Sequence, residues 1–98
     1  MDIKELQYFK TVCEQKSITQ AAYSLYMTPQ GLSKVMKNME AELGATLLIR
    51  SGSGVTLTES GKYLYEHLTD LLESYQTICN EIRCSEQREN HEIDLLSA

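Results

Sequence analysis

The chain has 98 residues, enough for one small domain with an appended element, and hydrophobic residues make up 42% of it. No run approaches the roughly 20 apolar residues of a membrane-spanning helix and no secretory signal begins the chain, so we expect a cytoplasmic protein with no membrane partner. The net charge of −5 argues against a strongly basic, non-specific nucleic-acid binder. That acidity lies in the second half, because residues 1–57 carry six cations and five acids whereas residues 58–98 carry three cations and nine acids.

A first helix is predicted to begin at Ile3. Asp2 and Glu5 have the spacing of a capping box, in which each side chain binds a backbone N–H at the helix end. Apolar residues then recur at helical intervals and would form the inner face: Leu6, Phe9, Val12 and Cys13. We expect this helix to end near Lys16.

A second, shorter helix should follow directly. Ser17 with Gln20 three residues later fits another capping box. The helical pattern of apolar residues then runs to Leu25 and stops at Tyr26 and Met27, which predicts a tight turn there.

A third helix is predicted over residues 29–43. Thr28 can cap it, and Pro29 suits its first position, where a backbone N–H is not needed. Gly44 would end it in the left-handed conformation. One face is apolar and consists of Leu32, Val35, Met36, Met39 and Leu43. Gly31 is unfavourable inside a helix by about 1 kcal/mol relative to alanine, and would either permit close packing on the preceding helix or be tolerated.

The opposite face of this third helix is polar and cationic, with Gln30, Ser33, Lys34 and Lys37. Such a helix can enter the DNA major groove by its amino end while the preceding helix supports it. An ordinary amphipathic helix pair with a solvated outer face fits this stretch equally well.

A two-stranded hairpin is predicted next. Residues 46–50 favour a strand, residues 51–54 are turn material, and residues 55–58 alternate apolar and polar side chains. Three helices followed by a hairpin is the order of a winged helix-turn-helix, in which the hairpin is the wing. Arg50 would suit a phosphate contact there, or a surface salt bridge of little energetic value.

Thr58 should cap a long helix over residues 58–84. Its apolar residues alternate at intervals of three and four, as in a coiled coil: Leu64, Leu68, Leu71, Tyr75, Ile78 and Ile82. We expect this stripe to pair with its copy in a homodimer, although a helix that only covers its own domain is the alternative. Residues 85–98 are polar and are predicted to be a connector, with residues 93–96 as a detached strand.

The runs SITQAAYSLYMTPQGLSKVMKNMEAELGATLLIR (residues 17–50) and GVTLTESGKYL (residues 54–64) resemble the amino-terminal domain of LysR-type transcriptional regulators. The resemblance covers about residues 1–85. It implies a mainly α winged helix-turn-helix over residues 1–57, followed by the dimerisation helix. It also implies a bacterial dimer or tetramer, whose small-molecule effector binds a carboxy-terminal domain that these 98 residues do not contain.

The resemblance further implies a set of DNA-contacting residues: Thr28, Pro29, Gln30, Ser33, Lys34, Lys37, Arg50 and Ser53. Thr28 and Arg50 would hold phosphates, while Gln30 could pair with adenine and Lys34 with guanine. The chain departs from the family in reading Pro29-Gln30-Gly31 where Gln-Pro-Ala is usual, so the base preference of that pair is not inherited. Lysines also stand where arginines are common and the wing is less basic, which predicts weak wing contacts and a shallow salt dependence.

We therefore expect a sequence-specific module of a transcription regulator that binds double-stranded promoter or operator DNA with paired half-sites. The alternative is a winged helix that binds proteins and not DNA, which the low charge of the first half favours. We expect no enzyme, cofactor or metal site, because phosphate-binding glycine loops, metal-ligand spacings and nucleophile–base pairs are missing. Cys13, Cys79 and Cys84 are expected to be reduced thiols.

Overall fold

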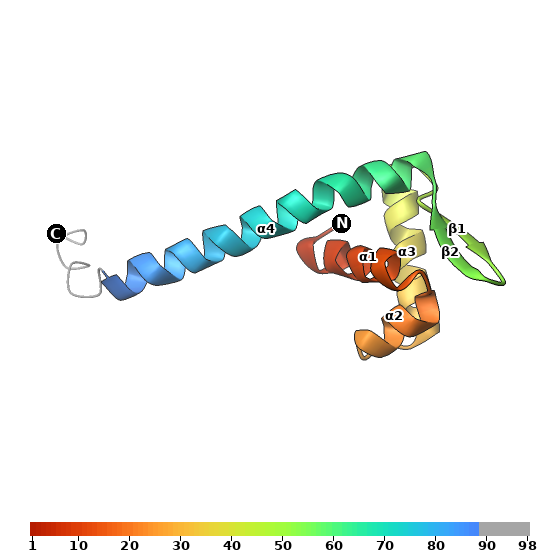
Figure 1. Cartoon of the computed structure of the whole chain (residues 1–98), viewed down its shortest axis with the longest axis horizontal. Coiled ribbons are helices and arrows are strands. Elements are labelled where there is room, and N and C mark those ends of the chain that lie inside the picture. The colour runs from red at the N-terminus through yellow and green to blue at the C-terminus, as the bar shows by residue number, and fades with distance from the viewer. Residues whose placement is uncertain (89–98) are drawn as a thin grey trace.

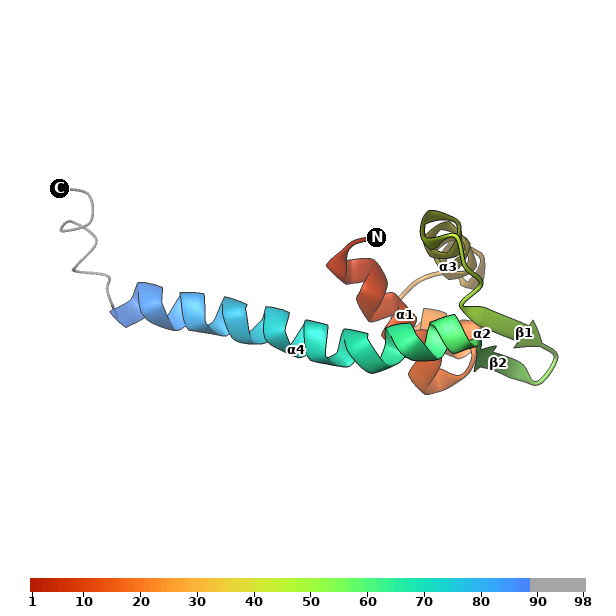
Figure 2. The same ribbon diagram turned by 90° about the horizontal axis from the view of Figure 1, so that it is seen from above.

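The computed structural model describes the backbone of residues 1–88 and the side chains of residues 1–86. In this part of the chain four helices and a two-stranded sheet follow one another as α1, α2, α3, β1, β2 and α4. Helices α1 to α3 and the hairpin form a compact body, from which α4 projects as a single rod (Figure 1; Figure 2). The predicted mainly α fold is confirmed, while the strand expected at residues 93–96 lies outside the described residues.

Helices α1 (Ile3–Gln15) and α2 (Ile18–Ser24) begin where their capping residues predict. Asp2 Oδ1 accepts from Glu5 N at 2.8 Å and Glu5 Oε1 accepts from Asp2 N at 3.1 Å, which completes the first capping box. At α2, Ser17 Oγ accepts from Gln20 N at 3.1 Å. The reciprocal bond, in which the Gln20 side chain would accept from Ser17 N, is not found among the described residues. The second prediction was therefore correct for the cap and wrong for the reciprocal box.

Helix α3 (Pro29–Leu43) is confirmed at both ends. The chain reaches it through Tyr26, whose φ of 57° makes the tight turn, and leaves it through Gly44 with φ of 68°. Thr28 Oγ1 accepts from Gly31 N at 3.0 Å and caps the helix.

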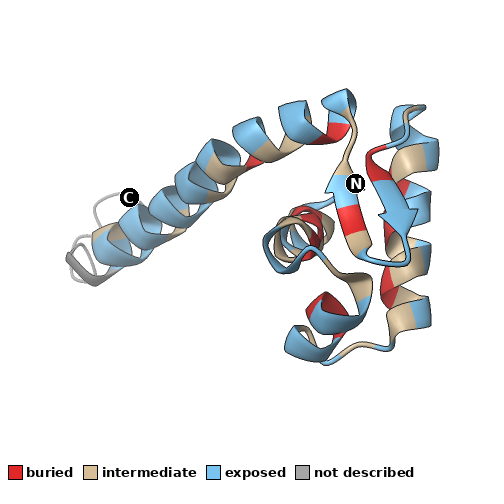
Figure 3. Ribbon diagram, turned by 45° about the vertical axis from the view of Figure 1, so that its right-hand side comes forward, coloured by how far each residue is buried: buried red, intermediate tan, exposed pale blue. Residues whose placement is uncertain are grey.

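The core lies where α1, α2 and α3 meet the base of the hairpin (Figure 3). Its largest fully buried side chains are Phe9, Val12, Leu32, Met36, Met39 and Leu68. The prediction was wrong for Leu43, which remains 44% exposed because the buried face of α3 ends at Met39. Burial of these apolar side chains is the main source of stability in a domain of this size.

Strands β1 (Leu48–Ser51) and β2 (Gly54–Leu57) form the predicted antiparallel hairpin, with Leu48 opposite Leu57. Val55 N donates to the Lys16 carbonyl at 3.1 Å, so the hairpin is attached to the end of α1. A Cβ on Gly54 would lie 2.5 Å from the same carbonyl, and φ there is 130°. Both facts require glycine at this position.

Helix α4 (Glu59–Arg88) begins one residue after the Thr58 cap and continues four residues past the predicted end at residue 84. Thr58 Oγ1 accepts from Gly61 N at 3.0 Å and donates to the Thr46 carbonyl at 2.6 Å. A Cβ on Gly61 would lie 2.2 Å from the Leu47 carbonyl oxygen. The first turn of α4 is thus held directly against residues 46 and 47, the segment that leads into β1.

The predicted apolar stripe of α4 is divided by the structure. Leu68 is 1% exposed and belongs to the core of its own domain, and Leu64 and Leu72 pack against that core. Farther along, the side chains of the stripe are exposed, from 45% at Tyr75 to 62% at Ile82. Leu64 and Leu68 therefore anchor the rod to the body, and the core extends beyond the predicted boundary at residue 57.

Candidate nucleic-acid interface

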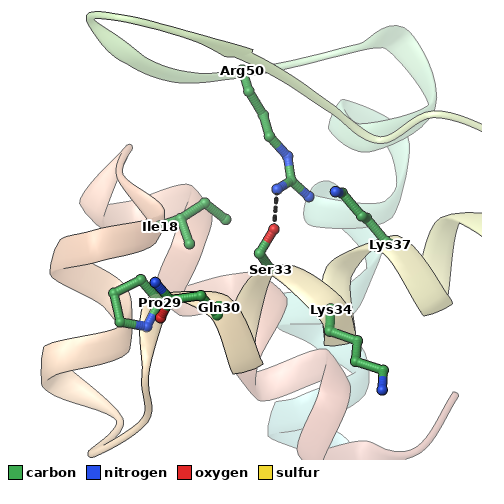
Figure 4. A pocket seen from close by; sticks show the side chains of 7 residues that line it. All are labelled: Ile18, Pro29, Gln30, Ser33, Lys34, Lys37 and Arg50. Carbon is green, nitrogen blue, oxygen red and sulfur yellow. Dashed lines mark hydrogen bonds between the residues drawn. The ribbon is translucent and has the colours of Figure 1, made fainter.

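An open cleft of about 570 Å³ lies between the outer face of α3 and strand β1. Its lining consists of Ile18, Pro29, Gln30, Ser33, Lys34, Lys37 and Arg50 (Figure 4). Six of the eight predicted DNA-contacting residues therefore border one cavity, although the sequence places them on a helix and on a strand. Thr28 and Ser53 do not line it.

The amino end of α3 is built by its cap. Thr28 Oγ1 accepts from Gly31 N and caps the helix. Pro29 and Gln30 are the first two residues of α3 and therefore lie directly beside this cap. A Cβ on Gly31 would lie 3.0 Å from Thr28 Oγ1 and meet nothing else within 4 Å. Of the two alternatives considered for Gly31, close packing on the preceding helix is not found among the described residues, and Gly31 leaves room for the Thr28 cap.

The charges around the cleft have one sign. Lys34, Lys37 and Arg50 are exposed, and among residues 1–86 none of them lies within ion-pair distance of a carboxylate. The ion pairs that do form in this part of the chain use the Met1 amine, Lys10 and Lys62 instead. The cleft is therefore positively charged in a chain of net charge −5, which favours an anionic ligand.

Arg50 crosses the cleft from β1 and binds Ser33 on α3. Its guanidinium Nη1 donates a hydrogen bond to Ser33 Oγ (Figure 4). The surface salt bridge considered for Arg50 is not found in the described part of the chain. Nothing in the sequence indicated this contact, because its two residues are 17 positions apart.

Glu40 helps to position the wing, and the sequence did not indicate this role. Its Oε2 accepts from the backbone N–H groups of Leu47 at 2.8 Å and of Leu48 at 3.2 Å. The carboxylate thereby ties the start of β1 to α3 and sets the position of the wing beside the cleft. An acid near the end of an amphipathic helix gives no signal of such a role, since most are solvated.

Ser53 lies in the turn of the hairpin, where its Oγ is 3.1 Å from Ser51 Oγ. It is exposed at the tip of the wing and away from the cleft. The predicted site therefore has two parts: a cleft on α3 and β1, and a separate wing tip.

Residues 3–62 match the family described as bacterial regulatory helix-turn-helix proteins, lysR family. Among curated proteins, the chain is 35% identical to the uncharacterized HTH-type transcriptional regulator YcgK of Bacillus subtilis, over 97% of this chain and 29% of that protein. It is 38% identical to the HTH-type transcriptional activator TtdR of Escherichia coli, over 81% of this chain and 26% of that protein. The chain thus spans less than a third of the length of these relatives.

The structure resembles that of a CbnR DBD–DNA complex, with a TM-score of 0.83 and 30% sequence identity. The alignment covers 87% of this chain and 98% of that one. In the part of this chain that the structure describes, no helix has the length and apolar character needed to cross a membrane.

Proposed function

The chain belongs to the lysR family of bacterial regulatory helix-turn-helix proteins, and from this premise we propose that it binds a specific DNA sequence through helix α3. The function is that of the DNA-binding module of a transcription regulator. The observation that carries the proposal is the cleft between α3 and β1, which is lined by three cations without carboxylate partners in residues 1–86.

The chemistry of the cleft suits the major groove, which is about 12 Å wide and admits one helix. Gln30 can donate to N7 and accept from N6 of adenine, and Lys34 can donate to O6 and N7 of guanine. Pro29, Ser33 and Lys37 lie on the same side of the helix and would complete the contact.

Phosphates on either side of the groove would be held by other groups. The candidates for these contacts are Thr28 at the start of α3, Arg50 on β1 and Ser53 at the wing tip. Such contacts set the position of the protein on the duplex and carry no sequence information of their own.

The exposed part of the α4 stripe supports association of two copies. Four large apolar side chains lie along one side of the rod beyond the body: Leu71, Tyr75, Ile78 and Ile82. Their burial between two rods would give a homodimer that carries two α3 helices and reads paired half-sites. Since the relatives are more than three times as long, the binding of a small-molecule effector and any tetramer would belong to a longer protein working in the cytoplasm.

The direct test is a gel shift on the promoter region of the chain's own gene at about 50 mM salt, where phosphate contacts are strong. Lys34→Ala should weaken binding about tenfold, since a base contact is worth roughly 1–3 kcal/mol. Lys4→Ala is the matched control, because Lys4 is an exposed cation on α1 outside the cleft.

Equal losses from Lys34→Ala and Lys4→Ala would show that the cleft does not recognise DNA. Absence of any DNA binding by the wild-type chain would favour the alternative, a winged helix that binds proteins.

A further inference from the structure

The contact between Arg50 and Ser33 has a consequence for which bases the cleft can read, provided that the cleft binds DNA as proposed above. A serine hydroxyl is ordinarily ambivalent, with one O–H donor and two acceptor lone pairs. It therefore reads either a donor or an acceptor on a base edge. An arginine guanidinium can only donate, and Arg50 Nη1 already donates to Ser33 Oγ.

Ser33 does not use its hydroxyl proton in the way that two other helical hydroxyls of this chain do. Thr11 donates to the Gln7 carbonyl at 3.1 Å, and Thr69 donates to the Tyr65 carbonyl at 3.4 Å, each four residues earlier in its helix. The corresponding acceptor for Ser33 is the Pro29 carbonyl, but in residues 1–88 no such bond is found. Arg50 uses one of the two lone pairs of Ser33 Oγ, while the Ser33 proton has no acceptor in the described part of the chain.

That proton belongs to a side chain that lines the cleft. Ser33 lies one helical turn after Pro29 and one turn before Lys37, on the face that would enter the groove (Figure 4). A charged donor on the oxygen also strengthens the outgoing O–H as a donor and repels a second N–H from the same oxygen.

We propose that Arg50 is a positioning residue that gives Ser33 a fixed polarity, so that Ser33 reads a hydrogen-bond acceptor on a base. Its targets are purine N7, guanine O6 or thymine O4. The exocyclic amines of adenine and cytosine, which can only donate in the major groove, are excluded. Arg50 thereby contributes to base specificity from the wing without touching a base.

The test is a selection from a random duplex library with the full 98-residue chain, followed by affinity measurements. The position read by Ser33 is the one at which Ser33→Ala loses the wild-type base preference. Duplexes that carry each of the four base pairs at this position are then compared. At the contacted position the wild-type chain should bind adenine, guanine or thymine, each of which offers an acceptor, about tenfold more tightly than cytosine, whose major-groove edge offers only the N4 amine. Arg50→Met should bind all duplexes more weakly and should also lose the preference at that same base pair.

Lys37→Met is the matched control. It removes a cation that lines the same cleft and has no hydrogen bond to Ser33, so it should weaken binding by a similar factor and keep the preference. Arg50, Ser33 and Lys37 lie outside the buried core, and thermal melting should show that the variants fold.

Three results would overturn the proposal: Arg50→Met retains the wild-type preference, Ser33→Ala changes no base preference, or the preferred base offers only an amine. Failure of the wild-type chain to enrich any duplex would instead remove the proposed function, and this inference with it. The two failures are distinguishable, because the wild-type chain still enriches a duplex in the first and enriches none in the second.

Discussion

At the scale of single residues, Cys13 shows how burial governs chemistry. It lies half-buried on α1, beside Val55 and Leu57 of β2. Desolvation raises the pKa of its thiol to about 12, and the nearby carboxylate of Glu14 adds to the effect. Cys84 on α4, in contrast, is exposed. Cys13 and Cys84 were both expected to be reduced thiols, but their reactivity should be very different.

We expect Cys13 to resist alkylation by iodoacetamide at pH 8, since a thiol of pKa near 12 is ionised in only about one molecule in ten thousand. Cys84 should react at the rate of a free thiol. Mass spectrometry of the labelled peptides measures both. Equal labelling of the two residues in the folded chain would show that Cys13 is accessible.

The raised pKa of Cys13 also predicts the sign of a pH effect. The unfolded thiol ionises from about pH 9, whereas the folded thiol holds its proton until about pH 12. Folding thus favours the protonated form, and its contribution to stability is complete below pH 9 and is lost as the pH rises from 9 to 12.

At the scale of elements, the position of the wing depends on Glu40. The hairpin has two short strands, and an isolated pair of strands is marginal in water. Its base is held by the two hydrogen bonds from Leu47 and Leu48 to the Glu40 carboxylate, and by Val55 N on the Lys16 carbonyl. Since Leu47 and Leu48 are buried, their N–H groups would have no easy access to water without Glu40.

Glu40→Ala should therefore lower the free energy of unfolding by about 1–3 kcal/mol, the cost of leaving buried donors unpaired. For a domain of this size each 1 kcal/mol corresponds to roughly 4–8 °C in melting temperature. Glu40→Gln should retain much of the stability, because its amide oxygen can still accept. Asn38→Ala, an exposed change on the same helix, is the control and should melt close to the wild type.

At the scale of the whole molecule, the single apolar stripe of α4 has one part that packs in the core and another part that is exposed. A helix of 30 residues is about 45 Å long, well beyond the body on which it rests. Its first turns fill the core through Leu68, and its later turns carry an unpartnered stripe (Figure 3). Folding of the body and the proposed association would therefore use different parts of one helix.

Substitutions on the two surfaces should have different effects. Leu71→Asp and Ile78→Asp should give monomers in analytical ultracentrifugation while the body remains folded, because both side chains are exposed. Leu68→Ala should instead lower the stability of the body by about 2–5 kcal/mol, as loss of a buried leucine does. Thr77→Asp places the same charge beside the stripe and is the control for charge alone. Dimers that persist in both Leu71→Asp and Ile78→Asp would mean that the association surface lies elsewhere.

The sequence alone determined the features that depend on neighbours a few residues apart. The caps at Asp2, Ser17, Thr28 and Thr58 place the helix starts, and Gly44 places the end of α3, because a helix end is satisfied by residues within one turn. The hairpin and the cationic face of α3 are equally local patterns. Six of the eight predicted DNA-contacting residues line one cleft, because five of them share a face of α3.

Only the tertiary structure decided which of several equivalent residues is buried and which residues form hydrogen bonds with one another. The regular spacing of apolar residues in α4 gave no sign that Leu68 would be buried and Leu71 exposed, because burial depends on where the body ends beneath the helix. The bonds from Leu47 and Leu48 to Glu40, and from Arg50 to Ser33, join residues 7, 8 and 17 positions apart. Such contacts follow from how α3 and the hairpin pack, and periodicity along the chain carries no information about them.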